Sequence, residues 1–206
     1  MVNEFNDYIL RLKQAVDNLQ EESINYLYSE IKKRIDSNHA IHLIGNGGSA
    51  ANASHIAGDF TKTFTMLGLK LNIVSATDNT CYVTAASNDI DFSEVYSTLV
   101  GINICAGDLI IYLSGSGNSI NLVKCAQKAK KFGINQIGIL GYNGGRLKQI
   151  LDKPIHIKIN DMEISEDVQL VIFHYIKQSF CREFKNNNKN LISSKYDKRV
   201  IEDIVS

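Results

Sequence analysis

Hydrophobic positions follow two different patterns along the chain. Over residues 3–37 they recur at helical spacing, and from residue 40 onward short apolar runs alternate with helical stretches. The helical series are Ile9, Leu12, Ala15, Leu19 and Ile24, Leu27, Ile31, Ile35. The pattern predicts two amphipathic helices ahead of the main fold. Their apolar stripes must be buried, and we expect them to pack against another subunit or on their own domain.

The alternating region predicts five strands separated by helices. We expect strands at residues 40–44, 71–75, 109–113, 136–140 and 155–159. We expect helices at residues 49–63, 92–104, 119–131, 145–150 and 163–184. Strands that alternate with helices indicate an α/β fold with a five-stranded parallel sheet flanked by helices, in a flavodoxin-like three-layer sandwich. The active crevice of such a sheet lies at the carboxyl ends of its strands.

The 206 residues suit one domain with added helices. Residues 1–37 form the predicted N-terminal helices, residues 38–184 the α/β domain, and residues 185–206 a polar tail rich in lysine and asparagine. Within this tail, residues 198–205 carry enough apolar positions for a short helix.

Charge and composition narrow the class of protein. The 22 basic and 22 acidic residues balance, so no net charge attracts nucleic acid. No apolar run approaches the roughly 20 residues that span a bilayer, and the chain is therefore expected to be cytoplasmic and free of membrane. The four cysteines contain no CxxC pair, and their apolar surroundings predict reduced core residues.

A glycine-rich segment joins the first predicted strand to the helix that follows it. Its residues are Gly45, Asn46, Gly47, Gly48 and Ser49. Glycines allow backbone N–H groups to approach an anion, and the helix N-terminus and the serine hydroxyl favour a phosphate there. The alternative is a tight turn without a ligand. The spacing matches neither a dinucleotide fingerprint nor a Walker loop, so a nucleotide is not favoured.

A second loop of this kind follows the third predicted strand. It contains Ser114, Gly115, Ser116, Gly117, Asn118 and Ser119 and leads into another helix. Uncharged backbone and serine donors suit a phosphate monoester held without lysine. Although each loop alone has the plain turn as its alternative, two such loops in one sheet favour ligand binding.

Four side chains carry candidate chemistry. His55 and Asp59 lie four residues apart and share one face of the first helix of the α/β domain. Glu166 and His174 lie eight residues apart on the last helix, with an angular offset of about 80°, so a shared site requires both to lean toward it. Two imidazoles and two carboxylates suit zinc or acid–base catalysis. Taken singly, each has an ordinary structural explanation, although the apolar neighbours of His174 in sequence call for a partner.

The segment GNGGSAANASH and the later segment SGSGNS together resemble the SIS (sugar isomerase) domain of phosphoheptose isomerases, over roughly residues 3–183. The resemblance implies an enzyme that converts sedoheptulose 7-phosphate into D-glycero-D-manno-heptose 7-phosphate through an enediol-type intermediate. It also implies a homotetramer with active sites between subunits, and heptose supply for lipopolysaccharide or capsule. Phosphate contacts would fall on Ser49, Ser114, Ser116 and Ser119 in the loops, with Gly115 among them, and Asn46, Gly47 and Asp89 would line the same pocket.

Zinc is a further implication of the resemblance, bound in some members through two histidines, a glutamate and a glutamine. The catalytic base would correspond to Asp59 and the acid to His174, with His55 and Glu166 as the remaining zinc-site positions. This chain departs from the pattern, because Asp59 stands where the family has glutamate and Glu166 where it has glutamine. Either the site is rebuilt around the shorter aspartate or activity is weak, and either carboxylate can be the base.

Other readings remain open at this point. One is an isomerase of another ketose phosphate, because phosphate loops do not report carbon number. Another is a non-catalytic SIS module that binds a sugar phosphate or a protein partner, although the two histidines and two carboxylates argue against it. A purely structural oligomer would explain the leading helices but not the loops.

Overall fold

The computed structural model describes residues 2–187 and contains a five-stranded parallel sheet with the strand order β2-β1-β3-β4-β5. The strands are β1 (Ala40–Ile44), β2 (Asn72–Ser75), β3 (Leu109–Ser114), β4 (Asn135–Leu140) and β5 (Ile155–His156). This is the flavodoxin-like order, in which the winding reverses between β1 and β3 and a crevice forms at their carboxyl ends. The predicted fold class is confirmed, and the fifth strand is shorter than predicted.

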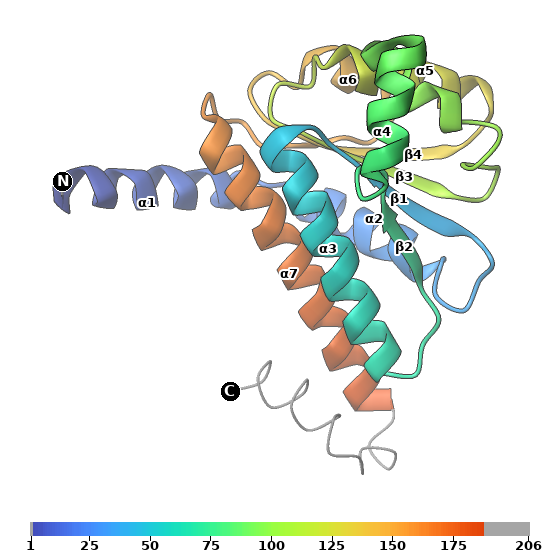
Figure 1. The fold of residues 1–206 in the computed structure, drawn as a ribbon. Coiled ribbons are helices and arrows are strands. Elements are labelled where there is room, and N and C mark those ends of the chain that lie inside the picture. The colour runs from blue at the N-terminus through green and yellow to red at the C-terminus, as the bar shows by residue number, and fades with distance from the viewer. Residues whose placement is uncertain (1, 188–206) are drawn as a thin grey trace.

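Helices cover both faces of this sheet (Figure 1). They are α1 (Val2–Asp17), α2 (Glu21–Lys32), α3 (Gly47–Met66), α4 (Thr80–Ala86), α5 (Ile120–Lys131), α6 (Gly145–Ile150) and α7 (Met162–Asn187). Ile41 and Leu43 of β1 pack with α2, α3 and α7, whereas Ile44 packs with α5 on the opposite face. Because both faces are covered, the central strands are almost continuously apolar. Helices α3 and α7 run side by side and extend beyond the sheet.

The prediction of a single helix over residues 92–104 is wrong. The chain forms two short 3₁₀ turns and then reverses, with Val100 bridged to Ile104. Gly101 has a φ of +86°, a left-handed conformation that a continuing helix does not allow. Val95, Tyr96, Val100 and Ile104 of the segment are buried in the core that includes α5, whereas Phe92 and Ile102 are exposed. The preceding helix α4 and the π-helical turn Ser87–Asp91 were not predicted.

The two N-terminal helices pack differently. In α2, Ile24, Leu27 and Ile31 are buried in the core, so this helix packs on its own domain. Helix α1 projects from the body (Figure 1) and leaves apolar side chains exposed, namely Phe5, Ile9 and Leu10. Packing of α1 on another subunit therefore stays a prediction.

Two further expectations concern exposure and the C-terminal tail. All four cysteines are free; Cys125 and Cys181 are buried as predicted, but Cys81 and Cys105 are exposed because α4 and the loop before β3 lie at the surface. The predicted helix at residues 198–205 lies outside the described residues. None of the helices in residues 2–187 combines the length and the apolar character that crossing a membrane requires.

Candidate active site

The first glycine-rich loop runs from the end of β1 into α3 and passes close to its own helix. A Cβ atom at Gly45 would lie 2.7 Å from the carbonyl carbon of Ser49, so only glycine fits. The Tyr96 hydroxyl donates a hydrogen bond to the Gly45 carbonyl oxygen at 3.1 Å and fixes the start of the loop. Ser49 is buried in the first turn of α3, where helix N–H groups and the helix dipole favour an anion.

The second loop connects β3 to α5 and is braced internally. The Ser114 hydroxyl accepts a hydrogen bond from the Gly117 N–H at 3.0 Å, and the Ser116 hydroxyl accepts one from the Asn118 N–H at 3.2 Å. Ser119 stands at the N-cap of α5 without a side-chain cap bond, so its hydroxyl is available to a ligand. Gly115 is buried between these serines.

An asparagine pair joins the two loops. Asn46 Nδ2 donates to Asn121 Oδ1 at 2.9 Å, and Asn121 Nδ2 donates to Asn46 Oδ1 at 3.0 Å. Asn121 is only 1% exposed, so bulk water cannot satisfy its amide if the pair is broken. Sequence reasoning missed Asn121, although a polar residue next to the apolar Leu122 and Val123 at the start of α5 was a signal.

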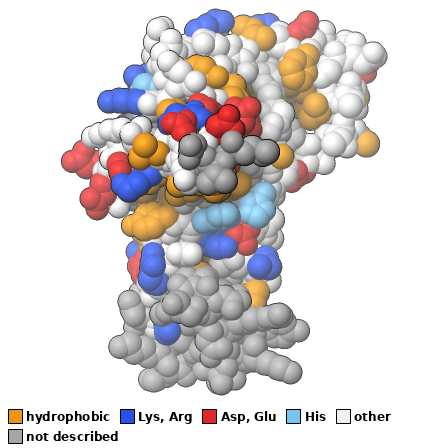
Figure 2. All heavy atoms as spheres, turned by 90° about the vertical axis from the view of Figure 1, so that its left-hand side faces the viewer, with side chains coloured by type: hydrophobic (Ala, Val, Ile, Leu, Met, Phe, Trp, Pro, Cys, Tyr) orange, Lys and Arg blue, Asp and Glu red, His pale blue; other side chains and the backbone are white. Residues whose placement is uncertain are grey.

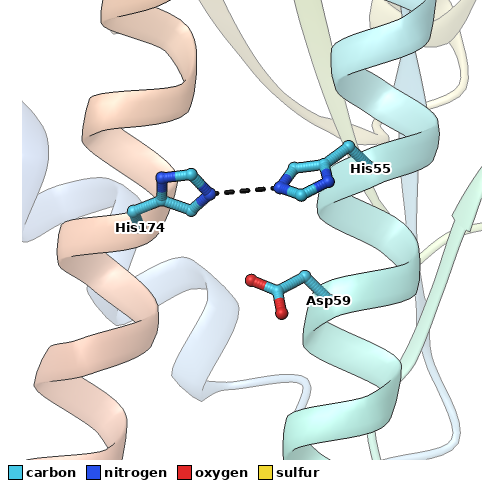
Figure 3. Close-up of side chains that lie close together, drawn as sticks. All are labelled: His55, Asp59 and His174. Atoms are coloured by element: carbon cyan, nitrogen blue, oxygen red, sulfur yellow. Dashed lines mark hydrogen bonds between the residues drawn. The ribbon is translucent and has the colours of Figure 1, made fainter. Parts of the chain in front are cut away.

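The histidines and Asp59 form a cluster between α3 and α7. His55 and Asp59 project from α3, and His174 projects from α7 to meet them (Figure 3). His55 Nε2 and His174 Nε2 are 3.1 Å apart, and the three potential ligand atoms all lie within 4.8 Å of one another. Figure 2 shows histidine side chains at the surface of this face, next to acidic and basic side chains. The cluster is therefore open to solvent.

This donor set fits a divalent metal. Two Zn–N bonds of about 2.0–2.1 Å at a tetrahedral angle place the nitrogen atoms about 3.3 Å apart. The observed 3.1 Å between the two Nε2 atoms is close to that value. Two histidines and a carboxylate with an open fourth position are one of the known ligand sets of catalytic zinc. His55, Asp59 and His174 would hold such an ion.

Glu166 lies with the first loop and outside this cluster. Its Oε1 accepts a hydrogen bond from the Ser49 hydroxyl at 3.1 Å, and its carboxylate lies against Gly48, where a Cβ atom would collide with it. Asn52 holds the same turn of α7 by donating to the Glu166 carbonyl oxygen and to Gln169 Oε1, each at 3.0 Å. Glu166 therefore places a carboxylate at the N-terminus of α3. Its role as a zinc ligand or base stays a prediction.

Asp89 lies in the segment that follows α4. It belongs to the exposed π-helical turn, and its Oδ1 accepts a hydrogen bond from Asn88 Nδ2 at 2.8 Å. Within residues 2–187, no hydrogen bond links Asp89 to either loop. Its predicted place in the substrate pocket stays a prediction.

Two lysines approach the carboxylate of Asp59. Lys177 Nζ on α7 pairs with Asp59 Oδ2, and Lys62 Nζ on α3 lies 3.8 Å from Asp59 Oδ1. Burial, the nearby Lys177 charge and His55 lower the pKa of His174, and Asp59 opposes them. Sequence reasoning missed Lys177, although its position three residues after His174 places both on one face of α7.

A cavity of about 770 Å³ is lined by residues of β2, α3 and α4, including Lys62. Its lining includes His42, Asp78 and Tyr82 but none of the loop serines and none of the three cluster residues. The side chains suited to phosphate binding and acid–base chemistry therefore lie in the loops and the cluster, outside the lining of this cavity.

Comparison with known proteins identifies the family. The model of the SIS domain family matches residues 4–141. A phosphoheptose isomerase from Clostridium acetobutylicum is 32% identical over 175 residues, which is 84% of this chain and 86% of the relative. One from Aneurinibacillus thermoaerophilus is 31% identical over 182 residues, covering 83% and 91%.

A solved structure agrees with these sequence relatives. The phosphoheptose isomerase from Neisseria gonorrhoeae superposes with a TM-score of 0.77 at 25% identity, covering 86% of this chain and 96% of that chain. The five-stranded parallel sheet flanked by helices accords with this relationship. The chain belongs to the SIS domain family and, within it, to the phosphoheptose isomerases.

Proposed function

We propose that this protein interconverts sedoheptulose 7-phosphate and D-glycero-D-manno-heptose 7-phosphate through an enediol-type intermediate. Family membership makes the chain a phosphosugar isomerase, and the seven-carbon substrate is the proposed part. The observation that carries the proposal is that one helix, α3, begins at the first phosphate-type loop and bears His55 and Asp59 further along. In this proposal, phosphate binding and proton transfer share one rigid element.

The spacing along α3 suits a sugar of this length. At about 1.5 Å of rise per residue, His55 lies about 9 Å along the helix axis from Ser49. In an extended heptulose phosphate, seven bonds separate C2 from phosphorus, which corresponds to about 9 Å at bond lengths near 1.5 Å. A phosphate at Ser49 would therefore allow the reacting carbon atoms to reach the cluster.

Aldose–ketose isomerisation moves a proton between C1 and C2 while a proton is exchanged at the sugar oxygens. We assign the Asp59 carboxylate as the base and His174 as the acid. In the metal-free protein, the hydrogen bond between His55 Nε2 and His174 Nε2 orients the His174 ring toward α3. A metal held by His55, Asp59 and His174 would polarise the carbonyl oxygen of the sugar. The carboxylate of Glu166, beside Ser49, would add a negative charge to the phosphate site.

The proposal has three further parts. The resident metal is zinc, and the protein is a homotetramer with α1 at its interfaces. Its role is cytoplasmic and supplies heptose to lipopolysaccharide or capsule. The exposed apolar side chains of α1 support a subunit interface there. Light scattering of the purified protein measures the number of subunits directly.

The decisive experiment incubates the purified protein, with and without zinc, with sedoheptulose 7-phosphate and follows the aldoheptose phosphate by NMR. We expect conversion by the wild type and a loss of at least about 100-fold in kcat for Asp59→Asn and for His174→Ala. The exposed Asp152 and His39 supply the matched controls Asp152→Asn and His39→Ala, which should retain turnover. No conversion by folded, metal-loaded protein would refute the proposal and favour another ketose phosphate or a non-catalytic binding module.

A further inference from the structure

The two lysines that approach Asp59 differ in their surroundings. The Lys177 side chain is 17% exposed and its Nζ pairs with Oδ2, whereas the Lys62 side chain is 67% exposed and its Nζ lies 3.8 Å from Oδ1. The Asp59 side chain is itself 14% exposed. An ion pair that is mostly shielded from water is screened less than one at the surface. Lys177 is thus the stronger of the two charges acting on this carboxylate.

The same carboxylate belongs to the donor set that fits a metal. Its oxygen lies within 4.8 Å of the ligand nitrogen atoms of His55 and His174. A divalent cation bound by these three groups would need an oxygen of Asp59 and would meet the positive charge of Lys177 at close range. Like charges at such distances repel strongly where water is partly excluded. The ammonium group of Lys177 and a metal ion would therefore compete for the carboxylate of Asp59.

We propose that Lys177 is an internal cation that competes with a divalent metal for Asp59. In the metal-free protein Lys177 holds the carboxylate, and a metal binds only when the lysine side chain turns away. The four-carbon stem of lysine and its partial exposure permit that movement without a change in α7. The inference rests on the metal site of the proposed function and adds a residue that sets the affinity of this site.

The test measures metal affinity and needs no turnover. Co²⁺ is titrated into the full-length protein at constant pH, by calorimetry and by the visible absorption of the bound ion. Lys177→Met keeps an unbranched side chain that is one atom shorter and removes its charge. We therefore expect Co²⁺ to bind at least about tenfold more tightly, a change that corresponds to about 1.4 kcal/mol. Lys177→Arg keeps the charge and should bind Co²⁺ no more tightly than the wild type.

Two controls assign the effect to the pair. Lys62→Met removes the exposed lysine on the same carboxylate, and we expect the Co²⁺ affinity to change less than about threefold because that charge is screened. In an Asp59→Asn background, Lys177→Met should give a clearly smaller gain, because the competition for the shared carboxylate is gone and only the repulsion between the two cations is relieved. Circular dichroism melting verifies that each variant is folded, and Lys177→Gln replaces Lys177→Met if the latter is not.

The proposal is overturned if neither the wild type nor the variant without the Lys177 charge binds Co²⁺, or if this variant binds it no more tightly than the wild type. A gain of equal size in Lys62→Met, or a gain that is not reduced by Asp59→Asn, also overturns it. Failure of the isomerase assay with a confirmed affinity change would reject the proposed reaction and leave the competition intact. Conversion of the sugar with unchanged metal affinities would support the proposed reaction and reject the competition.

Discussion

Asn46 and Asn121 exchange two side-chain hydrogen bonds, of 2.9 and 3.0 Å, across the crevice between β1 and β3. Asn46 belongs to the loop that opens α3, and Asn121 stands in the first turn of α5 behind the serine-rich loop. The pair fixes the distance between two candidate phosphate-binding loops that are far apart in sequence. Preorganisation of this kind reduces the entropy lost when an anion binds.

Removing this pair is expected to weaken phosphate binding. Asn121→Ala leaves the Asn46 amide without its partner, at a cost of about 1–3 kcal/mol in unfolding free energy. It also frees the first loop to move, so the Kd for inorganic phosphate and the KM for the sugar phosphate should rise about tenfold. Calorimetry with phosphate and steady-state kinetics measure both. The exposed Asn25→Ala is the control, and unchanged phosphate affinity in Asn121→Ala would contradict the bracing role.

Asp59→Glu introduces the residue that the family resemblance leads one to expect at this position. The carboxylate of Asp59 already lies within 4.8 Å of both imidazole ligand atoms, and Lys177 contacts it. The site is therefore built around the shorter side chain, and a carboxylate displaced by about 1.5 Å should lower kcat by about 100-fold. Isomerase kinetics with Asp152→Glu as the surface control test this. A higher kcat would mean that the aspartate weakens the wild-type enzyme.

Glu166→Gln should strengthen anion binding. The variant keeps an oxygen that can accept the hydrogen bond from Ser49 but removes a negative charge from the N-terminus of α3. Relief of about 1 kcal/mol of repulsion would lower the Kd for inorganic phosphate about fivefold. Titration calorimetry measures the change, and the exposed Glu163→Gln on α7 controls for general charge effects. Weaker phosphate binding in Glu166→Gln would show that the carboxylate does not oppose the anion.

Glu30 and Arg34 form an ion pair of 2.6 Å in the core, with side-chain exposures of 3% and 5%. Burial alone would raise the pKa of Glu30, but hydrogen bonds from Lys33 and Arg34 outweigh it and lower this pKa. Glu30→Ala leaves the Arg34 charge buried without its carboxylate, so the free energy of unfolding should fall by about 3–5 kcal/mol. Urea denaturation measures it. Lys33 is exposed, so Lys33→Ala should lower the free energy of unfolding by less than about 1 kcal/mol. Equal losses for Glu30→Ala and Lys33→Ala would contradict the importance of the buried pair.

The partly buried position of His42 should make the stability of the protein depend on pH. Burial lowers the pKa of His42, although Asp108, whose Oδ2 lies 3.3 Å from His42 Nε2, opposes the shift. The unfolded chain therefore binds a proton more readily, with a pKa of about 6.5. This contribution to stability is complete above that pH and falls as the pH drops toward the folded pKa. His42→Gln should lose less unfolding free energy than the wild type between pH 7.5 and 5.5, as measured in urea. The exposed His39→Gln should behave like the wild type, and equal losses for His42→Gln would contradict the assignment.

Local signals in the sequence were enough for the sheet, the two loops and two of the three residues of the cluster. Continuous apolar runs predict buried parallel strands, and glycine and serine between a strand and a helix predict an anion loop. His55 and Asp59 could be placed together because a four-residue separation puts two side chains on one face of any helix. Residues 92–104 escaped this reasoning, because their apolar residues suggested a helix while Gly101 takes a left-handed conformation in the folded chain.

By itself, then, the sequence determined the order of the elements and which residues each loop and helix face carries. Only the tertiary structure decided that His174 meets His55, that Lys177 pairs with Asp59, and that Glu166 turns instead to Ser49. Glu166 and His174 share α7 and diverge by about 80° around its axis, so the packing of α7 against α3 selects what each one contacts. Such choices depend on how two helices distant in sequence lie against each other, which no local pattern of residues encodes.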